Sequence, residues 1–478
     1  MKIKILGLIS ITFICCSINK SYATPNKKDQ DSLLLTNKFQ NNPITISGLI
    51  KDKESGESLP YANVIVKNTN IGTTTNEDGF FTLFNVPSKT STIQVQFMGY
   101  KTEFLILTTE IASDKIIILM TPDSNQLEEV VISLDSGGEI MKMNKNVSQI
   151  SLSPKKLATI PNLGEKDIFR ALQLLPGVSG TNESSSGLYI RGGTPDQNLV
   201  LLDGFTVYHV DHFYGFFSAF NSDVIKDIQL FKGGFPAEYG GRISSVMDLT
   251  GKTGNSNNFS LSAGLSLLSA NATVEIPVGK KANLLISGRR SYTDILKSGL
   301  YNSIFDLYND SGPTSDSNLP LQARVLQNQL QPSFYFYDLN AKFSYKPTDK
   351  DIISVSLYNG EDNLDSSREN QNIIGSGTDQ ERTINADIED LLNWGNLGSS
   401  VRWARQWSDK FYTNVVGAYS NYFSQRKRIN DITVQLADST ITNKIGLIED
   451  NDLKDYTLRI HNEYKINSKH SLEFGAQL

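Results

Sequence analysis

Residues able to take part in chemistry are few, and the most suggestive of them lie in one short stretch. The chain has four histidines, and two of them, His209 and His212, stand on either side of Asp211. A bound metal ion needs three or four such ligands that converge on one point. Two histidines three residues apart on an extended segment rarely converge in this way. A structural or ligand-facing role is therefore favoured, and we predict no metal site.

Three pairs of neighbouring glycines invite comparison with phosphate-binding loops: Gly192-Gly193, Gly233-Gly234 and Gly240-Gly241. None of them stands in the strand, GxxxxGK and helix context that such a loop requires. No nucleophile elbow occurs, and the acidic residues are scattered over predicted loops without the paired carboxylates of a hydrolase. We predict that the protein is not an enzyme and needs no cofactor.

The N-terminal residues 1–23 have the organisation of a signal peptide. Two lysines precede an apolar run over 5–14, which has the length of a signal-peptide core and is too short to span a bilayer. Small residues around Ala23 suit a signal peptidase, so cleavage is predicted after Ala23. Cys15 and Cys16 suggest lipoprotein attachment as an alternative, but the residues before them are not small, as that signal requires. Both cysteines leave with the signal, so no disulfide or thiolate site is expected in the mature chain.

Composition argues against a helical membrane protein and against a nucleic-acid partner. Apolar residues make up 39% of the 478, and no stretch reaches the roughly 18 consecutive apolar residues of a membrane-spanning helix. If the chain crosses a membrane, a β-barrel is therefore the only route left. The 19 tyrosines and 23 phenylalanines suit strands joined by polar loops. The net charge of −6 and the lack of a long basic run give no support for nucleic-acid binding.

Residues 44–120, which follow a polar linker over 24–43, carry the signals of a small β-sandwich. Runs rich in β-branched and aromatic residues recur at 44–50, 62–68, 79–86, 91–99 and 115–120. The sequence Asn76-Glu77-Asp78-Gly79 predicts a turn between two of these runs, with Gly79 at positive φ. About six strands in this length can bury a core.

Residues 46–86, together with FMGYKTE at 97–103, resemble the carboxypeptidase regulatory-like domain. The resemblance implies an accessory module that often stands in front of outer-membrane receptors, rather than a catalytic domain. A secreted peptidase with such a module is an alternative. However, a zinc peptidase needs two histidines and a carboxylate on one metal, and this segment has no histidine.

Residues 153–250 mix helix and strand signals. Apolar residues at 168, 172 and 175 have a helical spacing, which predicts a helix over 164–175 that ends at Pro176-Gly177. Strand-like runs follow at 188–193, 198–204, 225–234 and 245–250. Asn221 and Ser222 are expected to precede a short helical stretch through Ile228.

This region resembles the plug domain of TonB-dependent receptors. The resemblance rests on LLPGVSG, then LYIRGGTPDQNLVLLDGFTVY, then FNSDVIKDIQLFKGGFPAEYGGRISSVMDL, and it implies a plug over 150–252. The stretch 208–217 departs from the starch-utilisation branch of the family, which argues against a paired surface lipoprotein and a glycan substrate. The plug motif carries over to Arg191, Gly192, Gly193, Asp203, Gly204, Gly233, Gly234, Tyr239, Gly240 and Gly241.

The segment 126–133 lies between the two regions and is short, extended in propensity and flanked by polar residues. Alone it reads equally well as a linker strand. Its position is where such receptors carry the box that binds a TonB-type energy-coupling protein, and a segment of this kind can add a strand to a partner's sheet edge. The residues implied are Glu128, Glu129, Val130, Val131 and Ile132.

Residues 258–478 alternate between apolar and polar side chains. Along 335–345 the odd positions are apolar with aromatic ends and the even ones mostly polar, and 259–265 and 472–478 repeat the alternation. This is typical of barrel strands that face lipid on one side, with aromatic residues at both interfaces. A soluble sandwich with one wet face is the alternative.

Connections of alternating length support the barrel. Short links are predicted at 279–281, 347–350, 406–409 and 467–470, and long polar loops at 295–332, 363–393 and 428–451. A tight turn near Leu268-Ser269 gives nine strands in all. Receptors of this family close with about 22 strands. We therefore expect that the chain is a fragment, which alone neither inserts stably nor transports, because unpaired strand edges are costly in hydrocarbon.

The predicted fold class is mainly β: a signal peptide, a small β-sandwich, an α+β plug and the first strands of a transmembrane antiparallel β-barrel. The resemblance implies energy-coupled uptake of a scarce nutrient in the outer membrane, with the N-terminal domain in the periplasm. Siderophores, vitamins, peptides and glycans remain open as ligands. A surface adhesin or a structural barrel without transport is the alternative. Residues expected to face the ligand, or alternatively to pack against the barrel wall, are Tyr208, His209, His212, Phe213 and Tyr214.

Overall fold

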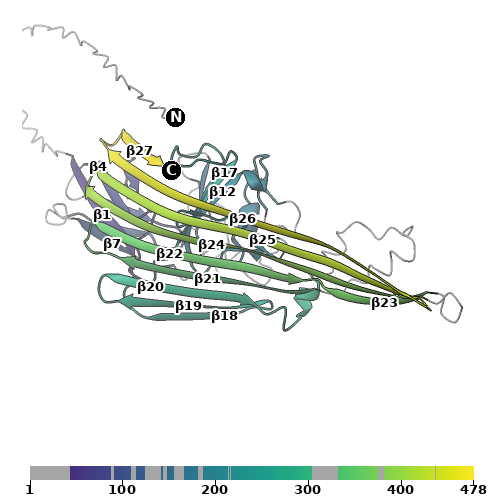
Figure 1. Cartoon of the computed structure of the whole chain (residues 1–478). Helices are drawn as coiled ribbons and strands as arrows, with labels where there is room; N and C mark the ends of the chain where they lie inside the picture. Colours follow the sequence, from purple (N-terminus) through teal and green to yellow (C-terminus); the bar gives the residue numbers. More distant parts are fainter. Residues whose placement is uncertain are drawn as a thin grey trace, which may run out of the picture. The chain divides into compact units, whose positions relative to one another are not determined.

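The computed structural model describes residues 43–87, 91–108, 115–123, 141–143, 148–154, 166–180, 187–213, 215, 217–303, 332–374, 382–436 and 438–478. Residues 42–478 form one compact unit, whose strands fall into three groups (Figure 1). Within the described ranges, no helix is long and apolar enough to cross a membrane. The predicted signal peptide, the linker, the coupling segment 126–133 and Tyr214 lie outside these ranges.

The first group, residues 43–123, is a two-sheet sandwich that we call the β-domain. One sheet has the order β4-β1-β7 and the other β3-β2-β5-β6. Their strands are β1 (Ile44–Asp52), β2 (Asn63–Val66), β3 (Gly72–Thr74), β4 (Phe80–Val86), β5 (Thr92–Gln96), β6 (Glu103–Ile106) and β7 (Ile116–Met120). The sheets enclose an apolar core that includes Ile50, Val64, Leu83 and Val95. The predicted sandwich is present.

The turn predicted at residues 76–79 connects β3 to β4. Gly79 has a φ of +81°, and a Cβ at this position would lie 2.9 Å from a carbonyl oxygen of β1. The side chain of Asn76 accepts hydrogen bonds from the backbone N–H groups of Asp78 and Phe80, at 3.1 and 3.0 Å. An Asx turn of this kind fixes the backbone locally. Glu77 and Asp78 therefore sit next to each other on a closely defined turn.

The second group, residues 141–254, is built on a six-stranded sheet and is called the central domain. The sheet has the order β13-β12-β17-β16-β9-β8. Its strands are β8 (Met141–Met143), β9 (Gln149–Leu152), β12 (Asn198–Leu202), β13 (Phe205–Thr206), β16 (Ile225–Phe231) and β17 (Ser245–Gly251). Two small hairpins accompany it, β10 (Val178–Ser179) with β11 (Tyr189–Ile190), and β14 (Asp211–His212) with β15 (Phe217–Ser218). A short 3-10 helix, η3 (Pro195–Gln197), precedes β12.

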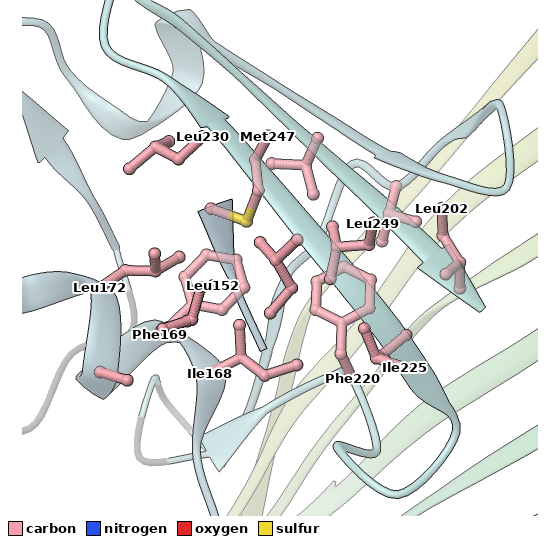
Figure 2. Packing of buried hydrophobic residues seen from close by; sticks show 14 of the residues in the cluster. Leu152, Ile168, Phe169, Leu172, Leu202, Phe220, Ile225, Leu230, Met247 and Leu249 are labelled. Atoms are coloured by element: carbon pink, nitrogen blue, oxygen red, sulfur yellow. The ribbon is translucent and has the colours of Figure 1, made fainter. Parts of the chain in front are cut away.

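Helix α1 (Ile168–Gln173) packs its apolar side against this sheet. Asp167 caps the helix by accepting a hydrogen bond from the backbone N–H of Arg170 at 3.0 Å. Ile168, Phe169 and Leu172 are buried in the cluster that Figure 2 shows. The helical spacing of residues 168, 172 and 175 therefore predicted both the helix and its buried face, although the helix is shorter than the expected 164–175.

The helical stretch expected after Ser222 is wrong. Residues 222–224 form a turn, and β16 begins at Ile225. β16 is paired on both sides, with β17 and with β9, and most of its side chains are buried. The run predicted as strand-like at 225–234 therefore contains β16, and only the helical expectation over its first residues fails.

The third group, residues 258–478, is one antiparallel sheet that we call the wall (Figure 1). Nine strands follow one another in pairing order among the described residues, and a further strand, β23, pairs with β24 alone. They are β18 (Ser260–Leu265), β19 (Ser269–Val278), β20 (Ala282–Ser291), β21 (Ser333–Tyr345), β22 (Asp351–Asp365), β23 (Arg368–Ile374), β24 (Arg382–Ser408), β25 (Phe411–Gln435), β26 (Thr440–Lys465) and β27 (Ser471–Gln477). Short turns at 279–281, 346–350, 409–410 and 466–470 mark one end, the short-turn end.

The two faces of the wall differ as the alternation predicts. Leu339, Leu357 and Val401 project from the outer face and are 54%, 51% and 55% exposed. Asp338 and Tyr358, each next to one of these residues in the sequence, are on the inner face and are 0% and 2% exposed. Successive side chains of a strand point to opposite faces, so one face is apolar and open and the other is largely polar and covered.

Aromatic residues mark two levels on the outer face. Phe411 lies against Tyr464, with ring centroids 6.2 Å apart, and Tyr419 against Tyr456, at 5.0 Å. The two levels are separated by residues 411 to 419 on β25 and 456 to 464 on β26, a length of about 27 Å along a strand. A tilted strand of that length crosses most of the roughly 25 Å apolar band of an outer-membrane barrel.

Two of the long loops predicted in the wall are largely strand instead. β22 continues to Asp365, β24 begins at Arg382, β25 runs to Gln435 and β26 starts at Thr440, so that β24, β25 and β26 have 27, 25 and 26 residues. A crossing needs only about 9–11 residues. Their paired part beyond Tyr419, together with β23, is called the extension (Figure 1). The polar composition of these segments predicted loops, because polar strands and loops are similar in composition.

The core of the β-domain gives a first prediction. Ile50 of β1 is fully buried, whereas Ile117 of the neighbouring β7 is 59% exposed. Replacing Ile50 by Ala removes buried methyl groups, and we expect the free energy of unfolding of the β-domain to fall by about 2–5 kcal/mol. Ile117→Ala is the matched control and should change it by less than about 0.5 kcal/mol. Hydrogen exchange of the β-domain amides in the whole chain measures both; equal effects would contradict the assigned core.

Candidate functional site

The central domain meets the inner face of the wall first at Asp203-Gly204. These two residues join β12 to β13 and have φ angles of +47° and +91°. Asp-Gly with both angles positive is the preferred composition of a type I′ hairpin turn. A Cβ on Gly204 would lie 2.9 Å from Cγ1 of Val416 on β25. Glycine is thus required both for the turn and for its close approach to the wall.

The carboxylate of Asp203 binds groups from both partners. Its Oδ1 accepts from Lys342 Nζ at 2.6 Å and from the backbone N–H of Gly251 at 3.0 Å, and Oδ2 accepts from Ser356 Oγ at 2.9 Å. The Asp203 carbonyl oxygen accepts from Ser400 Oγ at 2.8 Å. Burial alone would raise the pKa of Asp203, but the charge of Lys342 outweighs it and the pKa is lowered. The ionised carboxylate therefore bridges the central domain and two wall strands, and the Asp203 carbonyl oxygen reaches a third.

A second contact is made by the segment that leads to His209. Asn396 of β24 accepts with Oδ1 from the backbone N–H groups of Tyr208 and His209, at 3.2 and 3.1 Å. Its Nδ2 donates to the His209 carbonyl oxygen at 2.7 Å. The hydroxyl of Tyr208 donates to Asp455 of β26 at 3.0 Å. The backbone of this segment is therefore held by the wall.

The ring of His209 remains partly open, because its side chain is 31% exposed. Trp394 Nε1 donates to His209 Nε2 at 2.7 Å, and the ring stacks on Tyr422 with centroids 6.1 Å apart. The carboxylate of Asp211 lies 3.3 Å from the same nitrogen.

The third contact is the side chain of His212, which lies between two wall carboxylates. Nδ1 is 2.5 Å from Asp362 Oδ2 and Nε2 is 2.9 Å from Asp338 Oδ1. Burial by itself would lower the pKa of His212, but the two carboxylates outweigh it and raise the pKa to about 10. The imidazole is therefore doubly protonated, and both nitrogens donate.

The wall balances the charge around His212. Arg289 Nε donates to Asp338 Oδ2 at 2.7 Å, while Nη2 donates to the Ser218 carbonyl oxygen of the central domain at 2.8 Å. Tyr358 places its hydroxyl 3.0 Å from the Ala219 carbonyl oxygen. Two carboxylates thus face one guanidinium and one imidazolium, and the buried group is neutral as a whole.

Phe213 is fixed next to this cluster in an unusual backbone conformation. Its φ is +50°, which is rare for an aromatic residue and costs about 1–3 kcal/mol. Its backbone N–H donates to Asp362 Oδ1 at 3.2 Å, and its ring packs on Phe334 with centroids 4.5 Å apart. His212 and Phe213 are 2% and 4% exposed, so both pack against the wall.

The other motif residues shape turns within the central domain. A Cβ on Gly193 would lie 2.1 Å from Ser244 Oγ, so Arg191-Gly192-Gly193 forms a turn that packs closely on the segment before β17. Tyr239 is buried and donates from its hydroxyl to Asp248 at 2.9 Å. The remaining glycines of the motif, which lie on the connection between β16 and β17, are Gly233, Gly234, Gly240 and Gly241.

Two family models match this chain, and each covers one of the first two groups of strands. Residues 46–132 match the CarboxypepD_reg-like domain, and residues 145–246 match the TonB-dependent Receptor Plug Domain. The central domain is a TonB-dependent receptor plug domain. The turn at Asp203-Gly204 and the contacts of His209 and His212 all belong to this plug domain, which packs on the inner face of the wall.

Two curated relatives are named TonB-dependent receptors. TonB-dependent receptor P3 of Formosa agariphila is 27% identical over 242 residues, which are 48% of this chain and 23% of that protein. TonB-dependent receptor SusC of Bacteroides thetaiotaomicron is 28% identical over 173 residues, 34% of this chain and 16% of that protein. The chain spans less than a quarter of the length of these relatives. Both belong by name to the family that the sequence resembles.

Solved structures give a weaker likeness, of fold alone. The siderophore receptor PirA from Acinetobacter baumannii is 13% identical, with 69% of this chain and 60% of that chain covered and a TM-score of 0.34. The outer membrane transporter YddB from Escherichia coli is 12% identical, with 69% and 56% covered and a TM-score of 0.35.

Sequence reasoning singled out the plug side of these contacts and missed the wall side. Asp338, Asp362 and Lys342 stand at inward positions of regular strands, where charged residues are expected to face water. The alternation predicted that these residues face inward. It did not predict their partners in the plug domain. Within the described ranges no group of three His, Cys, Asp or Glu residues is arranged to hold a metal ion.

Removal of the Asp203 carboxylate tests the first contact. Asp203→Asn leaves Lys342, whose side chain is 9% exposed, without its anion. We expect the plug domain to lose about 3–5 kcal/mol of stability in its seat. Asp223→Asn is the control, since Asp223 pairs with Lys166 at an exposed site and the change should cost less than about 1 kcal/mol. Urea titration followed by the fluorescence of Trp394, which contacts His209, measures both; a small effect of Asp203→Asn would refute the anchoring role.

The charge of His212 predicts a pH dependence. Its pKa is raised above the ordinary value of 6.5 to about 10 on folding, so its contribution to stability is complete below pH 6.5 and is lost as the pH rises through 10. The same urea titration should show a stability that falls between pH 7 and 10. The double variant His212→Gln with Asp362→Asn keeps polar groups in place without this titration and should remove the dependence. If the double variant falls in parallel with the parent, His212 is not the group responsible.

Proposed function

We propose that this chain works in an outer-membrane receptor that binds a scarce nutrient at the cell surface and imports it with energy supplied from the inner membrane. The observation that carries the proposal is the seating of a plug domain on the polar face of a wall whose other face is apolar with aromatic levels. An apolar outer face suits lipid, and a plug on the inner face suits a pore that is blocked at rest.

The contacts of the plug domain also suit a part that moves. Apolar side chains such as Phe213 and Phe217 pack on the wall, and beside them Asp203 and His212 hold the plug domain through hydrogen bonds and ion pairs. Such groups can exchange their partners for water when a force displaces the plug domain, whereas apolar side chains cannot. Contacts of this kind fix one resting position of the plug domain on the wall and still allow the plug domain to leave it.

Energy enters, in this proposal, through the segment 128–132. Glu128, Glu129, Val130, Val131 and Ile132 would pair as a strand with a TonB-type protein in the periplasm. The segment lies between the β-domain and the plug domain in the sequence, so a pull on it acts directly on the plug domain. This arrangement puts the β-domain and the short-turn end of the wall in the periplasm, and the extension outside the cell.

For the nutrient we propose contact with Tyr208 and His209. Both are partly exposed, and His209 presents an aromatic face and a stacked neighbour, Tyr422. Aromatic faces suit bulky ligands. The sequence and structure leave four classes of ligand open, namely siderophores, vitamins, peptides and glycans. A surface adhesin or a structural barrel needs no plug domain, and the presence of one therefore favours transport over these alternatives.

A proline in the coupling segment tests this function. Val131→Pro removes a backbone N–H that strand addition needs. We expect binding of the periplasmic part of the energy-coupling protein to fall at least about tenfold, and nutrient-dependent growth of the native cell to be lost with an unchanged amount of receptor. Val131→Thr keeps the N–H and the β-branched shape and should behave like the parent. Undiminished growth with Val131→Pro would reject energy coupling through this segment.

A further inference from the structure

The β-domain contacts the inner face of the wall near the short-turn end. Its turn at residues 76–79 lies against Arg402 of β24, a strand that ends at Ser408. Arg402 Nη1 donates to Asp78 Oδ1 at 2.7 Å, and Nη2 donates to Glu77 Oε2 at 2.9 Å. The turn that Gly79 and Asn76 define thus presents two carboxylates to one guanidinium, the pairing for which the planar fork of arginine is suited.

Two further wall residues complete this contact. Tyr412 of β25 donates from its hydroxyl to Asp78 Oδ2 at 2.6 Å, and Asn414 Nδ2 donates to Glu77 Oε2 at 3.0 Å. Asp78 and Tyr412 are only 5% and 4% exposed. A carboxylate buried to this degree needs charged and hydrogen-bonding partners. The wall supplies them from two neighbouring strands.

An apolar cluster extends the same contact. Phe80, which follows the turn, is 8% exposed and packs with Ile352 of β22, Ala404 of β24 and Tyr412 of β25. Ala404 is 1% exposed. The buried cores of protein interfaces are enriched in aromatic residues and arginine, and this contact contains Phe80, Tyr412 and Arg402.

The β-domain also contacts the plug side. Glu57 accepts hydrogen bonds from the backbone N–H groups of Thr253 and Gly254, the latter at 3.2 Å, and from Thr253 Oγ1 at 2.8 Å. Lys226 of β16 donates from Nζ to the Ser58 carbonyl oxygen at 3.2 Å. The β-domain therefore bridges the plug domain and the wall.

These contacts cover side chains that a passing solute would meet. Arg402, Ala404, Tyr412 and Asn414 face inward, as do the wall residues that hold the plug domain. A solute that had passed the plug domain would leave the wall along this surface. We propose that the β-domain is a stopper that closes the short-turn mouth of the wall beneath the plug domain, with Glu77 and Asp78 held by Arg402. The closed position of the β-domain at rest does not depend on the import function, since it needs neither nutrient nor energy coupling. Its displacement while a nutrient passes rests on the proposed import function.

Accessibility of Ala404 tests the stopper directly. A cysteine at this position, introduced as Ala404→Cys in a chain with Cys15 and Cys16 replaced by Ser, is covered by Phe80 as long as the β-domain is in place. The probe is a maleimide coupled to polyethylene glycol, applied to the chain in detergent solution, since the chain alone is not expected to insert stably. We expect labelling to be at least about tenfold faster after Arg402→Ala, which removes the only guanidinium at Glu77 and Asp78 in the described contacts.

Two controls separate loss of the stopper from general damage. Arg405→Ala removes an arginine three residues along the same strand, which pairs with Asp351 and does not contact the β-domain in the described structure; it should leave labelling of Ala404→Cys unchanged. Ser287→Cys reports on the seat of the plug domain, because Ser287 is 1% exposed and its hydroxyl accepts from Asn221 at 3.2 Å. This second reporter should stay protected in the Arg402→Ala variant.

The stopper is supported if only Arg402→Ala exposes residue 404 while residue 287 stays covered. It is overturned if residue 404 labels as fast in the parent as in Arg402→Ala, since Arg402 then does not hold the β-domain over this residue. It is also overturned if Arg405→Ala has the same effect, or if residue 287 becomes exposed together with residue 404. Because none of these readouts uses uptake, a failure of the import function would leave the labelling result unchanged.

Discussion

The alternation of side chains along the wall strands is the constraint on which the other features depend. Leu339, Leu357 and Val401 face outward, each on its own strand. In each strand the residues directly before and after them must then face inward. Those positions are largely polar, so the plug domain is held there by ion pairs and hydrogen bonds as well as by apolar packing such as that of Phe213 on Phe334. It is held by Asp203 against Lys342, by His212 between Asp338 and Asp362, and by backbone groups against Asn396.

Buried charges of this kind give position rather than net stability. Removing them from water costs about as much as their mutual attraction returns, unless every donor and acceptor is used. Around His212 two carboxylates are matched by two cations, and around Asp203 the accepted hydrogen bonds come from both sides of the contact. The plug domain therefore has one well-defined seat, in which buried charges fix its position beside apolar packing such as that of Phe213 on Phe334.

Local patterns predicted much of the fold and only half of the site. The sandwich, helix α1, the turn at Gly79 and the nine strands in the wall's pairing order follow from periodicity and turn chemistry, which act over a few residues. β16 lies in the run predicted as strand-like at 225–234, and only the helical stretch expected through Ile228 is wrong. The extension was misread because polar strands resemble loops in composition. Contacts such as His212 with Asp362, 150 residues apart, depend on how strands line up across the wall, and no local pattern encodes that alignment.

The extension has a consequence for how its length can change. β24 and β25 pair without a break from Thr383 with Gln435 down to Gln406 with Tyr412. In such a ladder, deletion of two residues from each strand at matched positions keeps every remaining side chain on its face, whereas deletion of one residue turns the rest of the strand over. Natural variation can therefore lengthen or shorten this hairpin by two residues per strand at a time, while the membrane-facing part stays in register.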